Sequence, residues 1–151
     1  MQRRRLGQLE VSAVGLGCGT MTPFYGEPSR AAGIATIRRA REIGVDLLDT
    51  ADGYGRGRNE EFVAEAVRGH RGDYVIASKF GNLGLLGDPR FADGRPEYVH
   101  KACEKSLGRI IDNYDGHSIT QDSEGQPTTR QTQTPAILRF SQPRRGAKRT
   151  R

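Results

Sequence analysis

Three short apolar runs that alternate with helical patterns between residues 13 and 110 constrain the fold of this chain most strongly. Each run contains glycine or β-branched residues and ends at a turn, which is typical of a short buried strand. The runs cover residues 13–17, 45–49 and 74–79, and the helical patterns cover residues 30–43, 59–67 and 96–110. Such an alternation predicts a parallel α/β architecture. The preceding residues 3–12 predict a hairpin with a glycine turn.

Each helical segment has a residue that favours a helix start. Ser29 and Asn59 are suited to cap the first two helices, and Pro96 is suited to the first turn of the third. Apolar residues then recur at helical spacing, so one face of each helix is expected to be buried. These faces carry Ile34, Ile37, Ala40 and Ile43, then Phe62, Val63, Ala66 and Val67, then Val99, Ala102, Cys103, Ser106 and Ile110.

Two of the predicted strands end on charged residues. Asp49 ends one strand, Lys79 ends the next, and Tyr54 lies between two glycines on the loop after Asp49. Because the carboxyl ends of parallel strands meet at one edge of a sheet, we expect an acid, a base and a phenol to converge there as an active site. Taken singly, Tyr54 also fits a loop aromatic, Lys79 a solvated strand end, and Asp49 a turn or cap residue.

Four motifs that include these residues resemble the aldo/keto reductase family. They are residues 15–20, residues 49–55 with Asn59 and Glu60, residues 78–81, and Ser106-Leu107 followed by Arg109. They occur in the order and at the spacing of the family, and the resemblance covers about residues 3–114. The glycines at 15–19 also suggest a dinucleotide-binding fingerprint, but their spacing differs from it and no helix opens directly after them.

The resemblance implies an activity and a site. Members of this family reduce a carbonyl to an alcohol with NADPH and carry no metal. By resemblance, Tyr54 donates the proton to a small carbonyl substrate, Lys79 assists it, and Asp49 pairs with Lys79. Gly19, Thr20 and Asp49 would border the nicotinamide end of NADPH. A phenol ordinarily loses its proton near pH 10, and a nearby ammonium group eases that loss, so these side chains suit the chemistry.

The length of the chain excludes a complete barrel. A TIM (β/α)8 barrel needs roughly 200–250 residues or more, whereas this chain has 151. We therefore expect an α/β fold that is a partial TIM barrel, with an N-terminal hairpin and about three βα units, in a domain of residues 1–114. Residues 115–151 are polar and basic without a hydrophobic period, and they are expected to form a disordered C-terminal tail.

The resemblance ends at the family's fourth catalytic position. A strand that ends in histidine would be expected there, but His117 lies about four residues short of that register and Gln121 occupies the position. His70, His100 and His117 are each expected to be surface or loop residues. Most family contacts to NADPH also come from later barrel strands.

Two functions follow from this partial resemblance. The first is a truncated NADPH-dependent reductase, from a frameshift, a splice variant or a shortened gene, that is inactive as an isolated chain. The alternative is a non-catalytic interaction fragment that associates with itself or with a full-length reductase through open strand edges.

The net charge of +6 does not describe the body of the protein. Six basic residues and no acids lie between Arg139 and Arg151, and the rest of the chain is balanced. Only Phe140 offers a stacking surface in that segment, so we do not expect a nucleic-acid partner.

The cysteines and the hydropathy pattern bear on the compartment. Cys18 and Cys103 fit no metal or redox spacing and are expected to be small, mostly buried thiols. No run approaches membrane-spanning length, and no apolar stretch follows the arginines at residues 3–5. We therefore expect no membrane association and a cytoplasmic protein.

Overall fold

The strands form a hairpin and a separate three-stranded sheet in the computed structural model, which describes residues 1–22, 29–86 and 91–112. β1 (Arg3–Leu6) and β2 (Leu9–Ser12) make the antiparallel hairpin. The sheet has the order β3-β4-β5, and both of its strand pairs are parallel. Its strands are β3 (Gly15–Gly17), β4 (Leu47–Asp49) and β5 (Val75–Ala77).

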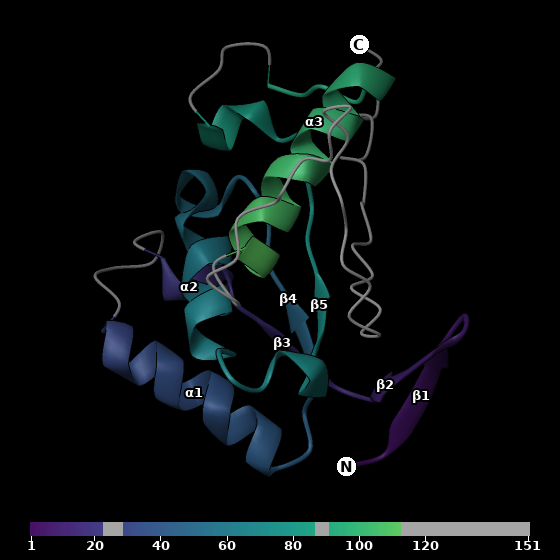
Figure 1. Ribbon diagram of the computed structural model, residues 1–151, viewed down its shortest axis with the longest axis vertical. Helices are drawn as coiled ribbons and strands as arrows, with labels where there is room; N and C mark the ends of the chain where they lie inside the picture. The colour runs from purple at the N-terminus through teal and green to yellow at the C-terminus, as the bar shows by residue number, and fades with distance from the viewer. Residues whose placement is uncertain (23–28, 87–90, 113–151) are drawn as a thin grey trace, which may run out of the picture.

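A helix follows each strand of this sheet. The helices are α1 (Arg30–Glu42), α2 (Arg58–Ala66) and α3 (Pro96–Leu107), and α3 continues into a π-helical turn at Gly108–Asp112. In Figure 1, α1 and α2 lie on one side of the strands and the hairpin lies on the other. The predicted hairpin and the three successive strand–helix units are therefore confirmed.

The two faces of the sheet carry different side chains. Leu16, Leu48 and Ile76 are paired across the three strands, and Leu48 and Ile76 are buried in the core. Side chains alternate between the faces of a sheet, so the neighbouring residues point the other way. Those neighbours are Gly15, Gly17, Leu47, Asp49, Val75 and Ala77, which are exposed or half-buried within the described part of the chain.

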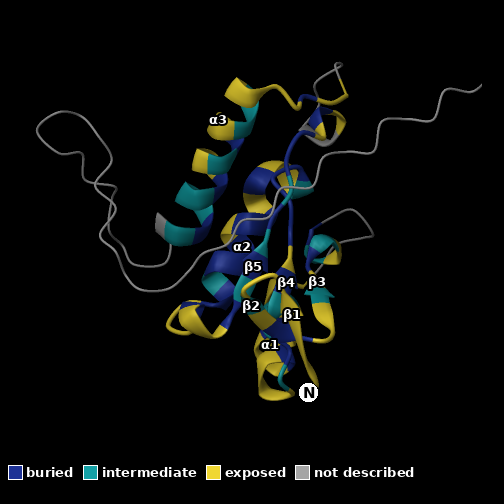
Figure 2. Cartoon of the chain, turned by 90° about the vertical axis from the view of Figure 1, so that its right-hand side faces the viewer, coloured by how far each residue is buried: buried dark blue, intermediate teal, exposed yellow. Residues whose placement is uncertain are grey.

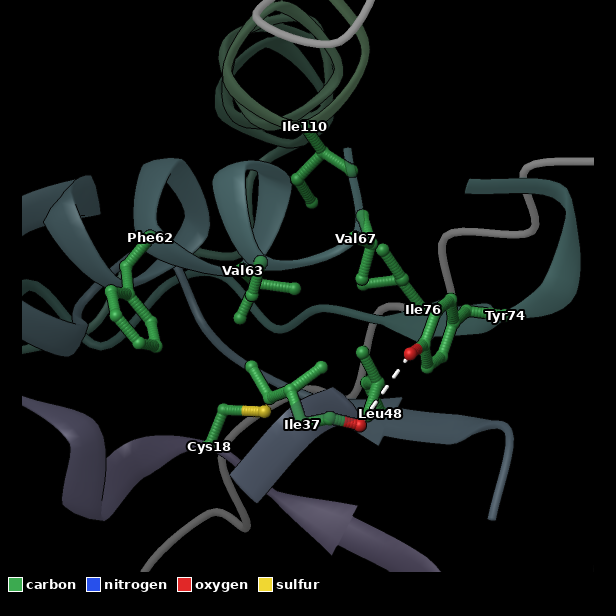
Figure 3. Packing of buried hydrophobic residues seen from close by; sticks show 10 residues of the cluster. Cys18, Ile37, Leu48, Phe62, Val63, Val67, Tyr74, Ile76 and Ile110 are labelled. Atoms are coloured by element: carbon green, nitrogen blue, oxygen red, sulfur yellow. Dashed lines mark hydrogen bonds between the residues drawn. The ribbon is translucent and has the colours of Figure 1, made fainter. Parts of the chain in front are cut away.

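The hydrophobic core lies between the sheet and the helices. Figure 2 shows buried residues concentrated where the helices meet the strands, and Figure 3 shows the core side chains converging from both. The Tyr74 hydroxyl donates a hydrogen bond to the Ile37 carbonyl oxygen at 3.4 Å, which satisfies the one polar group of that ring. The buried members of the core are Cys18, Ile37, Leu48, Phe62, Val63, Ala66, Val67, Tyr74, Ile76 and Ile110.

The hairpin is attached to the amino end of β4 by polar contacts. The Ser12 N–H donates to Asp46 Oδ1 at 2.7 Å, and the Asp46 N–H donates to Ser12 Oγ at 3.1 Å. Arg3 of β1 forms an ion pair with Asp46. Although burial by itself would raise the pKa of Asp46, the Ser12 and Arg3 hydrogen bonds hold that pKa below its usual value.

Most of the predicted helix starts are confirmed. The Ser29 side chain accepts a hydrogen bond from the Ala32 N–H at 3.3 Å at the start of α1, and Pro96 is the first residue of α3. The prediction that Asn59 caps α2 is wrong. Gly57 is the residue before that helix, with a left-handed φ of 89°, and Asn59 lies inside the first turn.

The predicted burial of Ile43 is also wrong, because Ile43 is 50% exposed. α1 ends at Glu42, and Gly44 then takes a positive φ of 86° that turns the chain toward β4. The face that α1 presents to the core therefore ends at Ala40, which is buried.

The predicted positions of two histidines and the predicted burial of Cys18 are confirmed, whereas several other predictions lie outside the described residues. His70 and His100 are exposed, as predicted, and among the cysteines Cys18 is buried while Cys103 is half-buried. His117, Gln121, the boundary at residue 114 and the predicted disorder of residues 115–151 all lie outside the described ranges. Within those ranges, no helix combines the length and the apolar composition needed to cross a membrane.

The contact between α1 and α2 generates a prediction. A Cβ atom at Gly33 would lie 2.7 Å from Cζ of the buried Phe62 ring. A helical Gly→Ala change ordinarily stabilises by about 1 kcal/mol, but we expect Gly33→Ala to lower the free energy of unfolding by roughly 1–3 kcal/mol because of this overlap. Urea denaturation measures the change.

The control for this prediction is Phe62→Leu, made alone and together with Gly33→Ala. Removing the ring edge should make the alanine less costly in the double variant than in the single one. A Gly33→Ala variant that is more stable than the parent protein would contradict the packing of α1 on α2.

Candidate active site

Asp49 and Lys79 are brought together at the carboxyl ends of β4 and β5. The two strands are paired in parallel with Asp49 opposite Ala77, and the Thr50 N–H donates to the Ala77 carbonyl at 2.8 Å. This register places the Lys79 ammonium against the Asp49 carboxylate, with which it forms an ion pair. Lys79 Nζ also donates to the Thr50 carbonyl at 2.7 Å. Two acceptors therefore fix the position of the ammonium group.

Tyr54 completes the predicted cluster. Lys79 Nζ lies 5.2 Å from the centroid of the Tyr54 ring. Gly19 also adjoins the ring, since a Cβ atom there would lie 3.2 Å from Tyr54 Cε2. The structure thus brings the acid, the base and the phenol together at one edge of the sheet, as the sequence predicts.

A left-handed turn separates Tyr54 from α2. Gly55, Arg56 and Gly57 have φ values of 57°, 58° and 89°. Arg56 is one of the few non-glycine residues with positive φ, a conformation that ordinarily costs about 1 kcal/mol or more. The turn connects Tyr54, which lies near Lys79, to the start of α2.

The energetics of the Asp49–Lys79 pair indicate a positional role. The Asp49 side chain is 52% exposed and the Lys79 side chain 29% exposed. Pairs in such solvated surroundings contribute about 0–1 kcal/mol to stability. The pair therefore contributes little to the stability of the fold, and it holds the ammonium group beside the Tyr54 ring.

Open space adjoins Asp49 on the uncovered face of the sheet. Gly17 pairs with Asp49 across β3 and β4, and apart from the neighbours of Gly17 in the chain, no atom of the described residues lies within 4 Å of the position that a Gly17 Cβ would occupy. Gly19 is half-buried and Thr20 exposed, and both lie in the short 3-10 turn Gly19–Met21 that follows β3. Open space thus adjoins the strand position opposite Asp49, and Gly19 and Thr20 lie on the turn that follows β3.

The structure adds to the site polar residues that the sequence analysis placed in the motifs without assigning them to the active site. Asn59 and Glu60 are fully buried at the start of α2, and their side chains bond to Thr50 and Ser78 respectively. Arg109 bonds to the second oxygen of Glu60. These contacts could have been anticipated from the polar residues within the motifs, because polar side chains in buried segments need hydrogen-bond partners.

Asp52 lies beside this buried cluster and is 6% exposed. Burial and, next, the charge of Glu60 raise the pKa of Asp52 to about 6, while Gly53, Arg109 and Lys105 act in the opposite direction. Since an unfolded aspartate ionises near pH 3.9, the folded state holds this proton more tightly than the unfolded state. The contribution of Asp52 to stability is thus complete below about pH 4 and is lost as the pH rises through about 6.

This pKa predicts the behaviour of Asp52→Asn, which cannot ionise. At pH 7 to 8 we expect the variant to be more stable than the parent by roughly 1–3 kcal/mol, and near pH 4 we expect the two to converge. Urea denaturation from pH 4 to 8 measures the difference. Glu104→Gln removes an exposed carboxylate from α3 and is the control. An Asp52→Asn effect as independent of pH as that of the control would contradict the raised pKa.

Comparison with known proteins agrees with this geometry. A model of the aldo/keto reductase family matches residues 15–121. The chain is also 39% identical over 117 residues to the protein named "Uncharacterized oxidoreductase YqkF" of Bacillus subtilis (strain 168). That alignment covers 76% of this chain and 37% of the Bacillus protein, so the chain spans less than half the length of this relative.

Solved structures show the same relationship. The aldo-keto reductase AKR11C1 from Bacillus halodurans, in its holo form, matches with a TM-score of 0.61 and 33% identity over 73% of this chain and 36% of that chain. An aldo-keto reductase from Klebsiella pneumoniae in complex with NADPH matches with a TM-score of 0.53 and 32% identity over 68% of this chain and 32% of that chain. These neighbours confirm the α/β fold as part of a TIM barrel. The chain belongs to the aldo/keto reductase family.

Proposed function

We propose that the cluster of Asp49, Tyr54 and Lys79 is the proton-donating centre of an NADPH-dependent oxidoreductase that reduces a small carbonyl compound to an alcohol. One observation carries the proposal: Lys79 Nζ is held between the Asp49 carboxylate and the Tyr54 ring, 5.2 Å from the ring centroid. The structure of the Klebsiella pneumoniae relative in complex with NADPH supports the choice of cofactor.

The proposed chemistry divides between the cofactor and the side chains. When bound, NADPH supplies the hydride for the carbonyl carbon. The Tyr54 phenol donates a proton to the carbonyl oxygen, and the Lys79 ammonium stabilises the charge left on the phenol oxygen. Asp49 and the Thr50 carbonyl hold that ammonium in place. The reaction thus needs a proton donor and a fixed cation, and both are present.

The residues around the site fit one end of the cofactor. The open space beside Gly17 and the exposed Asp49 carboxylate leave room for a planar ring, and Gly19 and Thr20 lie on the adjoining turn. We propose that these residues border the nicotinamide. Among the described residues we assign none to the adenosine end. The 151-residue chain alone is therefore proposed to bind NADPH weakly and to turn over slowly or not at all.

The compartment and the substrate class follow from the same proposal. Both cysteines are free thiols within the described residues, which is consistent with a reducing cytoplasm. The substrate is proposed to be a small carbonyl compound.

Two assays test the proposed function. NADPH oxidation is followed with a simple aldehyde, first for the chain itself and then for a chimera in which residues 1–112 replace the matching part of the Klebsiella pneumoniae reductase. We expect little turnover from the chain and clear turnover from the chimera. In the chimera, Tyr54→Phe should lower kcat by roughly 100-fold or more, because it removes the proposed proton donor.

The matched control is Tyr98→Phe, which removes a phenol hydroxyl from α3, outside the cluster. It should leave kcat unchanged within a factor of about two, and neither variant should abolish NADPH binding. A folded chimera that binds NADPH but reduces no aldehyde, or that keeps its rate in Tyr54→Phe, would refute the proposal.

A second function is favoured by an apolar groove at one edge of the sheet. The groove, of about 470 Å³, runs between β3 and α1. Val14 and Ile43 line it and are 57% and 50% exposed. In the part of the chain that the structure describes, β3 pairs only with β4. We propose that the chain also acts as an interaction fragment, which pairs with a second copy or with a full-length reductase along this edge.

Light scattering during gel filtration tests this second function. We expect a mass above that of the monomer, or co-elution with a full-length relative that is added. Val14→Lys with Ile43→Lys should abolish the association by placing charge in the groove. Phe91→Lys changes another exposed apolar residue outside the groove and should not. Monomeric behaviour of the chain at every concentration, with no co-elution, would rule the function out.

A further inference from the structure

Two adjacent residues at the start of α2 connect the helix to both strands that carry the site. Asn59 and Glu60 are each fully buried. Both lie in the first turn of α2, which begins just after the turn that carries Tyr54. The first connects to the end of β4 and the second to the end of β5, so one helical turn touches both sides of the Asp49–Lys79 pair.

Asn59 connects the ends of β3 and β4. Its Oδ1 accepts a hydrogen bond from Thr50 Oγ1 at 2.6 Å, and its Nδ2 donates to the Cys18 carbonyl at 2.8 Å. Thr50 is next to Asp49 in sequence, and the Thr50 carbonyl accepts the hydrogen bond from Lys79 Nζ. The residue that Asn59 binds, Thr50, thus supplies one of the two acceptors that hold the lysine, and it is the sequence neighbour of Asp49, which supplies the other.

Glu60 connects the end of β5 to the turn after α3. Its Oε1 accepts from Ser78 Oγ at 2.6 Å, and its Oε2 accepts from Arg109 Nη1 at 2.6 Å. Ser78 immediately precedes Lys79. A buried carboxylate is costly unless it is paired, so the arginine fixes the position of Glu60, and Glu60 in turn fixes Ser78. Gly57 makes room for the arginine, since a Cβ there would lie 2.5 Å from its Cζ.

We propose that Asn59 and Glu60 are positioning residues for the reaction: through Thr50 and Ser78 they set the distance between Asp49 and Lys79, and thus where the ammonium stands beside Tyr54. The importance of these two residues for catalysis rests on the proposed function, whereas their effect on the position of the Lys79 ammonium does not. A purely structural network would stabilise the fold and leave the lysine environment unchanged when one bond is removed. A positioning network would alter that environment.

The sequence offers a direct probe of the lysine environment. The chain has only four lysines, at positions 79, 101, 105 and 148. Incorporation of lysine labelled with ¹³C at Cε gives each of them one NMR signal without altering the ammonium group, and the signal that disappears in Lys79→Arg identifies Lys79. Its chemical shift reports on the carboxylate and the carbonyl that hold the ammonium.

The decisive variants are a matched pair at Thr50, together with Ser78→Ala. Thr50→Val keeps the shape of the side chain and removes the hydroxyl, whereas Thr50→Ser keeps the hydroxyl. We expect Thr50→Val and Ser78→Ala to move the Lys79 signal, and Thr50→Ser to retain the parent signal. Ser12→Ala is the control, because Ser12 is a buried serine with hydrogen bonds at the opposite end of β4. It should lower stability without moving the Lys79 signal.

Kinetics of the chimera give an independent second measurement. Thr50→Val and Ser78→Ala should lower kcat roughly 10- to 100-fold with little change in KM, because a misplaced group costs rate rather than binding. If the Lys79 signal moves no more in these variants than in Ser12→Ala, the positioning proposal is wrong. If the signal moves as expected but the folded, NADPH-binding chimera has no activity, the positioning stands and the proposed function fails.

Discussion

The carboxylate of Glu60, which has no exposure to water, imposes the strictest requirement in this structure. An unpaired buried charge costs several kcal/mol, and removing one partner of a buried pair typically costs about 3–5 kcal/mol. Arg109 and Ser78 meet the requirement with one hydrogen bond each. In this position the arginine lies where a side chain at residue 57 would be, and the left-handed φ of Gly57 favours glycine as well. One buried charge thus connects the start of α2 to the end of β5 and to the turn after α3.

One face of the sheet packs against the hydrophobic core, and the other carries the Asp49 carboxylate. Leu48 and Ile76 point into the core, while Asp49 belongs to the opposite, uncovered set. The exposed Asp49 carboxylate therefore lies on the side of the sheet away from the hydrophobic core. The ion pair of Asp49 with Lys79 contributes little to folding because it is solvated, so its geometry depends on the buried network below it.

Much of the fold could be predicted from local patterns. Glycine at residue 7, Ser29 and Pro96 act on their immediate neighbours, and the structure confirms the turn and the two helix starts that they indicate. Two local predictions failed for tertiary reasons. Asparagine is a common helix cap, but the Asn59 side chain instead forms buried hydrogen bonds with Thr50 and with the Cys18 carbonyl. Ile43 continues the apolar spacing of α1, but it lies past the point where the helix leaves the core.

The sequence by itself determined the order of strands and helices, the face of each helix that is buried, and the edge of the sheet where Asp49, Tyr54 and Lys79 meet. These properties follow from the hydrophobic periodicity of each segment and from the alternation of strands with helices, which predicts parallel strands. Both patterns can be read from short stretches of the sequence. Only the tertiary structure decided which polar groups support that edge. Glu60 and Arg109 are 49 residues apart, and their contact depends on how α2 and the turn after α3 pack, which no local pattern specifies.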